Sequence, residues 1–182
     1  MLRMLGLLLL CIGCAARPLP PPDNPAPAPD DAAQVIAEGS TVAAVTALGL
    51  HGEPVALSSF HTRLLVVYFY PLDFAAGASA EAQEFRDDQA RYRKLGVTVV
   101  GVSTDEPRTH QEFAAKLKIS YPLLSDIHGE LAGAFGIPLR GGTTRHATFI
   151  VDRRGVVRKA WPKVRPWGHS TEVLATLRKL GN

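Results

Sequence analysis

The run of residues 64–70 constrains the fold more than any other part of this sequence. It reads LLVVYFY, an unbroken apolar stretch of branched aliphatic and aromatic residues. Such a composition is typical of a central strand that is buried within a sheet. Pro71 follows at once and ends the strand, because proline has no N–H to donate to a neighbouring strand.

An amphipathic helix is predicted next, over residues 79–95. Its apolar positions, which alternate with Arg, Asp and Glu, are Ala82, Phe85, Ala90, Tyr92 and Leu95. Ser79 is a candidate N-cap, because its hydroxyl could accept a hydrogen bond from the first turn. Free N–H groups at a helix start attract anions, so the loop before this helix is a candidate functional site.

Strands and helices alternate along the rest of the chain. Residues 41–50 and 53–57 predict an N-terminal hairpin, and residues 97–102 predict a second buried strand. The remaining predicted elements are helices over 107–117, 129–135 and 168–180, a short strand over 121–124, and a hairpin of strands 147–151 and 156–161. This order favours an α/β fold, with a mixed central sheet flanked by helices.

The segment between the first long strand and its helix resembles the active-site segment of a known family. With its Pro71 and Gly77, it is similar to peroxiredoxins of the bacterioferritin comigratory protein subgroup, which carry Pro-x-x-x-Thr-x-x-Cys at this junction. Ala75 stands at the Thr position, and Ala78 stands at the position of the peroxidatic Cys. Gln83 stands where the subgroup can carry a resolving Cys. The resemblance therefore implies the frame of a thiol peroxidase without its reacting atoms.

The resemblance covers most of residues 39–180 and implies a thioredoxin-like fold. Further segments that carry it are GVSTD at 101–105, YPLLSD at 121–126, TFIVD at 148–152 and WPKV at 161–164. In the family, an Arg of the late hairpin stabilises the thiolate and binds the peroxide, and Arg145 is matched to that position.

Two roles remain open for Arg145. It could form a small-anion site with the backbone N–H groups of residues 77–79, as a remnant of the peroxide pocket. Alternatively, it could be a structural residue that is paired with Glu81 or Asp73.

Both cysteines, Cys11 and Cys14, lie at the extreme N-terminus. The remainder of the chain can therefore hold no disulfide, no zinc–thiolate site and no cysteine nucleophile. The six histidines show no pair at metal-ligand spacing, so neither a metal nor another cofactor is expected.

The N-terminal region predicts targeting to the cell envelope. Residues 1–14 resemble a signal peptide of the lipoprotein type, with Cys14 as the lipidated residue. An ordinary signal peptide, cleaved nearby to release a secreted or periplasmic protein, is the alternative. Residues 15–37 form a Pro-rich tether, and residues 38–182 form the peroxiredoxin-like domain.

The formal net charge is +3, and the positive charge is concentrated late in the sequence. From Arg140 onward there are ten Lys or Arg residues and two acidic residues. This cluster could be a solvated face, or it could contact anionic lipid. No nucleic-acid-binding motif accompanies it, so no nucleic-acid partner is expected.

These features predict a catalytically degenerate binding or scaffold module of the envelope. Its partners would be a small anion, another envelope protein, a homologous peroxiredoxin subunit in a mixed oligomer, or the membrane through its anchor. The alternative is an antioxidant peroxidase, an oxidoreductase that acts through an unrecognised group or with an active partner subunit.

Overall fold

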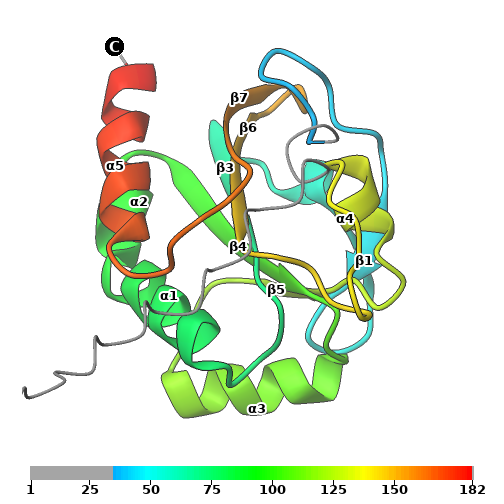
Figure 1. Cartoon of the computed structure of the whole chain (residues 1–182). Coiled ribbons are helices and arrows are strands. Elements are labelled where there is room, and N and C mark those ends of the chain that lie inside the picture. The colour runs from blue at the N-terminus through cyan, green and yellow to red at the C-terminus, as the bar shows by residue number, and fades with distance from the viewer. Residues whose placement is uncertain (1–34, 182) are drawn as a thin grey trace, which may run out of the picture.

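A computed structural model describes residues 35–181, which form one mixed sheet covered by helices on both faces (Figure 1). The strand order is β2-β1-β5-β4-β3-β6-β7. The strands are β1 (Thr46–Leu48), β2 (Pro54–Ala56), β3 (Leu64–Phe69), β4 (Val97–Ser103), β5 (Leu123–Ser125), β6 (Ala147–Asp152) and β7 (Val157–Trp161). The helices are α1 (Ala76–Asp87), α2 (Gln89–Lys94), α3 (Pro107–Leu117), α4 (Glu130–Ala134) and α5 (His169–Leu180), and η2 (Leu57–Ser59) is a single 3-10 turn.

The predicted central strand is confirmed as β3. It runs parallel to β4 and antiparallel to β6, and all six of its residues are buried. Parallel pairing on one side and antiparallel pairing on the other make the sheet mixed, as the order of elements predicted.

Alternate residues of β3 face two separate apolar layers. Val66 and Tyr68 belong to the layer beneath α1, α2 and α5, whereas Val67 and Phe69 belong to the layer beneath α4. Figure 1 shows α1, α2 and α5 together on one side of the sheet and α4 on the other.

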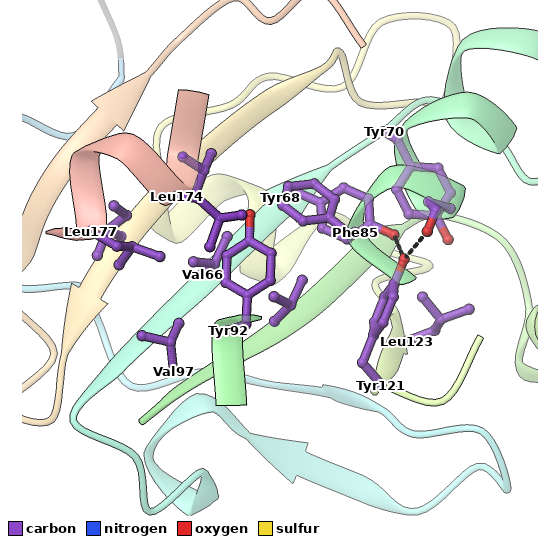
Figure 2. Close-up of a cluster of buried hydrophobic side chains, with 14 of the residues drawn as sticks. Val66, Tyr68, Tyr70, Phe85, Tyr92, Val97, Tyr121, Leu123, Leu174 and Leu177 are labelled. Carbon is purple, nitrogen blue, oxygen red and sulfur yellow. Dashed lines mark hydrogen bonds between the residues drawn. The ribbon is translucent and has the colours of Figure 1, made fainter. Parts of the chain in front are cut away.

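Aromatic side chains fill the layer beneath α1 (Figure 2). The rings of Tyr68 and Phe85 stack with their centroids 4.6 Å apart. The hydroxyls of Tyr68 and Tyr121 are hydrogen-bonded at 2.8 Å, and the Tyr121 hydroxyl also donates to the carbonyl of Ala82 in α1 (3.0 Å). These contacts fix α1 against β3, and the candidate site lies where these two elements meet.

The predicted helix over residues 79–95 is wrong in its bounds, because two helices occupy this region. α1 begins at Ala76 and ends at Asp87, and α2 follows after Asp88. The Asp88 carboxylate accepts hydrogen bonds from Ser170 Oγ of α5 (2.8 Å) and from Arg91 Nη1 (2.9 Å). The break between α1 and α2 therefore coincides with a contact between Asp88 and α5, which no pattern within residues 79–95 could reveal.

The first predicted strand, over residues 41–50, is also shorter than expected. Only Thr46–Leu48 pairs with β2, because the chain at Thr41 forms an isolated bridge to Val156 instead. The other predicted helices and strands are confirmed to within about two residues at each end, which is the ordinary uncertainty of element boundaries.

Candidate functional site

The candidate site lies at the start of α1, directly after the carboxyl end of β3. Ala75 is the N-cap residue of the helix and makes no side-chain capping bond. The N–H of Ser79 donates to the Ala75 carbonyl at 2.8 Å. Ser79 is therefore inside the helix, and the prediction that it caps the helix is wrong.

This placement decides which N–H groups of the first turn can reach a ligand. The first N–H groups of an α-helix have no partner within the helix, and here they belong to Ala76, Gly77 and Ala78. The Ser79 N–H was expected to contribute to an anion site, but it already has an intrahelical acceptor.

The motif positions differ sharply in their exposure. Ala75 is exposed, whereas Pro71, Gly77 and Gln83 are half-buried. Ala78, at the position that the resemblance assigns to the peroxidatic Cys, is fully buried and belongs to the core layer beneath α1. A side chain at position 78 thus points into the protein at the base of the first turn.

Arg145 lies in the segment that crosses this helix start. Its neighbour Thr144 donates a hydrogen bond from Oγ1 to the Tyr70 carbonyl at 2.7 Å, which holds the segment against the end of β3. Arg145 itself is half-buried. The two carboxylates proposed as its structural partners each lie beside a histidine, as described next.

Glu81 of α1 pairs with His146, a residue that the sequence did not single out. Their Nδ1 and Oε2 atoms lie 2.8 Å apart. The Glu81 side chain is fully buried, whereas 19% of the His146 side chain is exposed. A Cβ built on Gly77 would lie 3.3 Å from His146 Nε2, so the imidazole rests directly on the first turn of α1.

The alternation of β6 could have indicated His146. Thr148 and Ile150 pair with Tyr68 and Val66 of β3, and Ile150 belongs to the layer beneath α1. Extended to the residue before the strand, the period of two puts His146 on that same face. Position 146 is thus the one best placed to meet α1.

The electrostatics of the Glu81–His146 pair are dominated by burial. Burial raises the pKa of the Glu81 carboxyl above its ordinary value, although the hydrogen bond from His146 opposes the shift. Glu81 Oε1 is buried and forms no hydrogen bond among the residues that the structure describes. Burial of a carboxyl oxygen that makes no hydrogen bond costs free energy.

A second carboxyl–histidine pair lies on the other side of the same loop. Asp73 Oδ2 lies 2.8 Å from His110 Nδ1 of α3, and Asp73 Oδ1 accepts a hydrogen bond from the Tyr70 hydroxyl at 2.8 Å. The Asp73 N–H donates to Asp105 Oδ2 at 2.8 Å. These bonds fasten the loop to β3, to α3 and to the residues that follow β4.

The chemistry open to this site is limited by its side chains. No group of three or more His, Cys, Asp or Glu within residues 35–181 could hold a metal ion. Both cysteines fall in the part of the chain that the structure does not describe. A carboxyl and an imidazole can transfer a proton, and an arginine and backbone N–H groups can bind an anion, but none of them supplies a thiolate to attack a peroxide.

The predicted signal peptide, the Pro-rich tether up to residue 34 and Cys14 lie outside the described residues. Among the helices of residues 35–181, none has the length and apolar character needed to span a bilayer.

The chain is similar to known proteins over most of its length. Residues 39–160 match the AhpC/TSA family. Peroxiredoxin Q from the chloroplast of Sedum lineare is 36% identical over 148 residues, which cover 80% of this chain and 80% of that protein. Peroxiredoxin Bcp of Bacillus subtilis is 34% identical over 139 residues, covering 72% of this chain and 88% of its own length.

Solved structures show the same fold. Peroxidoxin BcpB of Mycobacterium tuberculosis superposes with a TM-score of 0.73 at 32% identity, covering 79% of this chain and 97% of that one. A cysteine-to-serine mutant of Xylella fastidiosa PrxQ gives a TM-score of 0.74 at 29% identity, covering 81% and 98%. The thioredoxin-like, peroxiredoxin fold implied by the sequence is therefore confirmed, and the chain belongs to the AhpC/TSA family of peroxiredoxins.

Proposed function

We propose that this protein is a catalytically degenerate member of its family that works by binding rather than by reducing peroxide. One observation carries the proposal: residue 78, at the buried base of the α1 first turn, is Ala, and no Cys occurs after Cys14. Peroxide reduction in this family needs a thiolate at that position, and the chain offers no other side chain of comparable nucleophilicity there.

The ligand proposed for the remaining site is a small anion, such as chloride, sulfate or a small carboxylate. The N–H groups of Ala76, Gly77 and Ala78 start a helix of 12 residues, whose dipole favours negative charge at this end. Arg145 and His146 belong to the segment packed across that helix start. A charge-assisted hydrogen bond from Arg145, together with hydrogen bonds from His146 and the helix-start N–H groups, would hold the anion weakly.

The alternative is an enzyme, and the relatives favour it. The bacterioferritin comigratory protein of Xanthomonas campestris, 31% identical with a TM-score of 0.70, has alkyl peroxide reduction activity. This chain could share that activity through an active homologous subunit, or through a group other than a thiol. A mixed oligomer would then co-purify with a cysteine-containing relative from envelope extract.

A peroxide-consumption assay separates the two functions. In a Cys11→Ser, Cys14→Ser background, the chain should consume no peroxide. Adding Ala78→Cys should create a thiol with a lowered pKa, because the helix start and the Arg145 guanidinium stabilise the thiolate. Adding Ala75→Thr to that variant should raise its rate further, by supplying a hydroxyl that orients the peroxide.

The matched control is Ala76→Cys, an exposed position two residues earlier on the same turn. Its thiol shares the helix start but not the buried position under the first turn, so it should react with peroxide more slowly than the thiol at position 78. Adding Arg145→Ala or His146→Ala to Ala78→Cys identifies which of these two side chains lowers the thiol pKa. Peroxide consumption by the cysteine-free chain would instead support the enzyme. If the thiol at position 78 reacts slowly with peroxide, and neither Arg145→Ala nor His146→Ala changes its rate, the pocket has decayed.

We also propose that Cys14 carries a lipid anchor, which would place the domain at a membrane of the cell envelope. The support is the small residue Gly13 before Cys14, together with the proline-rich segment that follows. Each buried methylene contributes about 0.8 kcal/mol, so stable anchoring needs more than one acyl chain. Mass spectrometry of the N-terminus should find acylated Cys14, whereas an unmodified N-terminus beyond it would refute the anchor.

A further inference from the structure

A basic surface cavity lies at the end of the sheet where β3 begins. Its volume is about 830 Å³, and it is bounded by the residues before β3, the β6–β7 turn and the end of α5. Leu64, the first residue of β3, pairs with Asp152, the last residue of β6. The candidate site described above lies at the other end of β3, about 17 Å away along a strand of this length.

Four arginines line the cavity and give it a positive charge: Arg63, Arg153, Arg154 and Arg158. Asp152 is the acidic residue among the lining side chains, so four positive charges and one negative charge leave a net +3 with His61 neutral. Arg178 and Lys179 add positive charge in the adjacent last turn of α5. Guanidinium groups suit phosphate because their planar N–H fork can bind two of its oxygens at once.

Asp152 pairs with one of these arginines, Arg158, and orders the turn that carries Arg153 and Arg154. Its Oδ1 accepts hydrogen bonds from the N–H groups of Arg154 (2.8 Å) and Val156 (3.0 Å), which fix the β6–β7 turn. Its Oδ2 binds Arg158 through Nε at 2.9 Å and Nη2 at 2.5 Å. Partial burial opposes these bonds, yet they hold the pKa of Asp152 below its ordinary value. Arg153 and Arg154 therefore project from a turn whose backbone is already ordered.

Arg63 adds a positive charge to the cavity from a different part of the chain. Arg63 precedes β3, and its Nη2 atom lies 3.1 Å from the position that a Cβ on Gly181 would take. The guanidinium of Arg63 thus reaches the end of α5. Cations from two separate segments border one space, as binding of a single multivalent anion requires.

Apolar side chains complete the lining. Phe60 and Leu64 contribute to the cavity wall, and Leu180 lines it while remaining 38% exposed. A ligand that combined a phosphate with an apolar portion would match both parts of this surface.

We propose that this cavity is a binding site for a phosphate or diphosphate group, separate from the site at the α1 start. The group could belong to an anionic phospholipid headgroup or to a free phosphorylated molecule, and both would use the same guanidinium contacts. The adjoining cavity of about 640 Å³ shares Arg153 and Arg154 and also includes Glu130, so the most favourable position for the anion is on the Arg63 side.

Titration calorimetry with inorganic pyrophosphate on the full chain tests the site. Wild-type protein should bind, and the double variant Arg153→Gln, Arg154→Gln should bind about tenfold or more weakly, since it loses charge-assisted hydrogen bonds to the anion. Arg63→Gln should also weaken binding, although it leaves the β6–β7 turn untouched. The control is Arg93→Gln, Lys94→Gln, which removes the same charge from exposed positions of α2.

Two results would overturn the proposal. One is the absence of pyrophosphate binding to the wild-type chain at low salt, where charge attraction is strongest. The other is an equal loss of affinity in the Arg153, Arg154 variant and in the α2 control, which would reduce the effect to net charge. A loss of pyrophosphate affinity that is confined to Arg63→Gln and to the Arg153, Arg154 variant supports a binding site formed by these arginines.

Co-sedimentation with vesicles identifies the source of the phosphate. All variants carry Cys14→Ser, so that no acyl chain contributes. Binding to mixed phosphatidylglycerol and phosphatidylcholine vesicles, but not to phosphatidylcholine alone, should disappear in the Arg153, Arg154 variant if the ligand is a headgroup. Pyrophosphate binding without that lipid dependence would support the site and assign it to a free phosphorylated molecule.

Discussion

Two carboxyl–histidine pairs flank the β3–α1 junction and share the same local geometry. In both, a histidine Nδ1 lies 2.8 Å from a carboxyl oxygen, and the acidic side chain is fully buried. Asp73 pairs with His110 on the α3 side, and Glu81 pairs with His146 on the β6 side.

Each pair leaves one buried polar atom without a hydrogen bond among the described residues, His110 Nε2 in the first pair and Glu81 Oε1 in the second, but the pairs differ at the carboxyl group and in their access to solvent. Both oxygens of Asp73 are hydrogen-bonded, one to the Tyr70 hydroxyl and one to His110, and the His110 side chain is fully buried. Glu81 uses one oxygen only, and its partner His146 is partly open to solvent.

This difference separates a structural brace from a candidate site. The Asp73 pair joins β3, the loop and α3, and it offers no surface to a ligand. The Glu81 pair lies beside the free N–H groups of α1, keeps an unmatched oxygen and reaches solvent through His146. Polar groups that are incompletely satisfied in this way are common where a protein binds or reacts.

The largest effect in this comparison is expected from Asp73→Ala. The change leaves the Tyr70 hydroxyl and His110 buried without their acceptor, and should cost about 3–5 kcal/mol of the free energy of unfolding. Denaturant unfolding monitored by circular dichroism measures this as a fall in the midpoint at constant slope.

The control for that measurement is Asp87→Ala. Asp87 forms an ion pair with Arg86 at 2.7 Å, but its side chain is 68% exposed. Its removal should cost about 1 kcal/mol or less, as surface ion pairs generally do. Similar losses at positions 73 and 87 would mean that the Asp73 pair is not a brace.

The sequence predicted the frame of this region better than its polar interior. The apolar run and Pro71 were enough to locate β3, and the proline at its start helped to place α3 at Pro107–Leu117. The predicted start of α1 is wrong because no polar side chain caps this helix, and the nearest serine, Ser79, lies inside it.

The two pairs themselves had no local signature. Their members are 37 and 65 residues apart, so only the folded chain brings them together. The predicted contacts of Asp73 or Glu81 with an arginine relied on opposite charge alone. His146 did have a signal in the sequence, because the alternation along β6 places position 146 on the face that meets α1.

A smaller effect is expected from Glu81→Gln. The amide keeps an oxygen for His146 and removes a carboxyl whose buried oxygen has no partner, so stability near neutral pH should change by about 1 kcal/mol or less. The contrast with Asp73→Ala would show that the charge of Glu81 is not what holds the fold together.

The pH dependence sharpens this contrast. Burial raises the folded-state pKa of Glu81 above its ordinary value of 4.5, so the folded chain binds this proton more tightly than the unfolded chain does. The resulting stabilisation is present at low pH and is lost as the pH rises through the folded-state pKa. Over this range, wild type should lose stability relative to Glu81→Gln. Unfolding curves that run parallel for the two proteins would contradict the burial argument.

The smallest effect is expected from Gly77→Ala, which tests whether the Glu81 pair has room to move. The added Cβ would lie 3.2 Å from Pro166 Cγ and 3.3 Å from His146 Nε2, so one of these neighbours must shift by a few tenths of an ångström. Replacing Gly with Ala inside a helix gains about 0.5–1 kcal/mol, which offsets a small displacement of a partly exposed ring.

The net change in unfolding free energy for Gly77→Ala should therefore stay within about 1 kcal/mol. Its coupling to His146→Ala in a double-mutant cycle reports the strain that the imidazole absorbs, and should be about 0.5 kcal/mol. A loss of several kcal/mol that His146→Ala relieves would mean that this imidazole is held as rigidly as His110. The Glu81 pair would then be a second brace, and ligand binding at the α1 start would depend on the backbone and Arg145 alone.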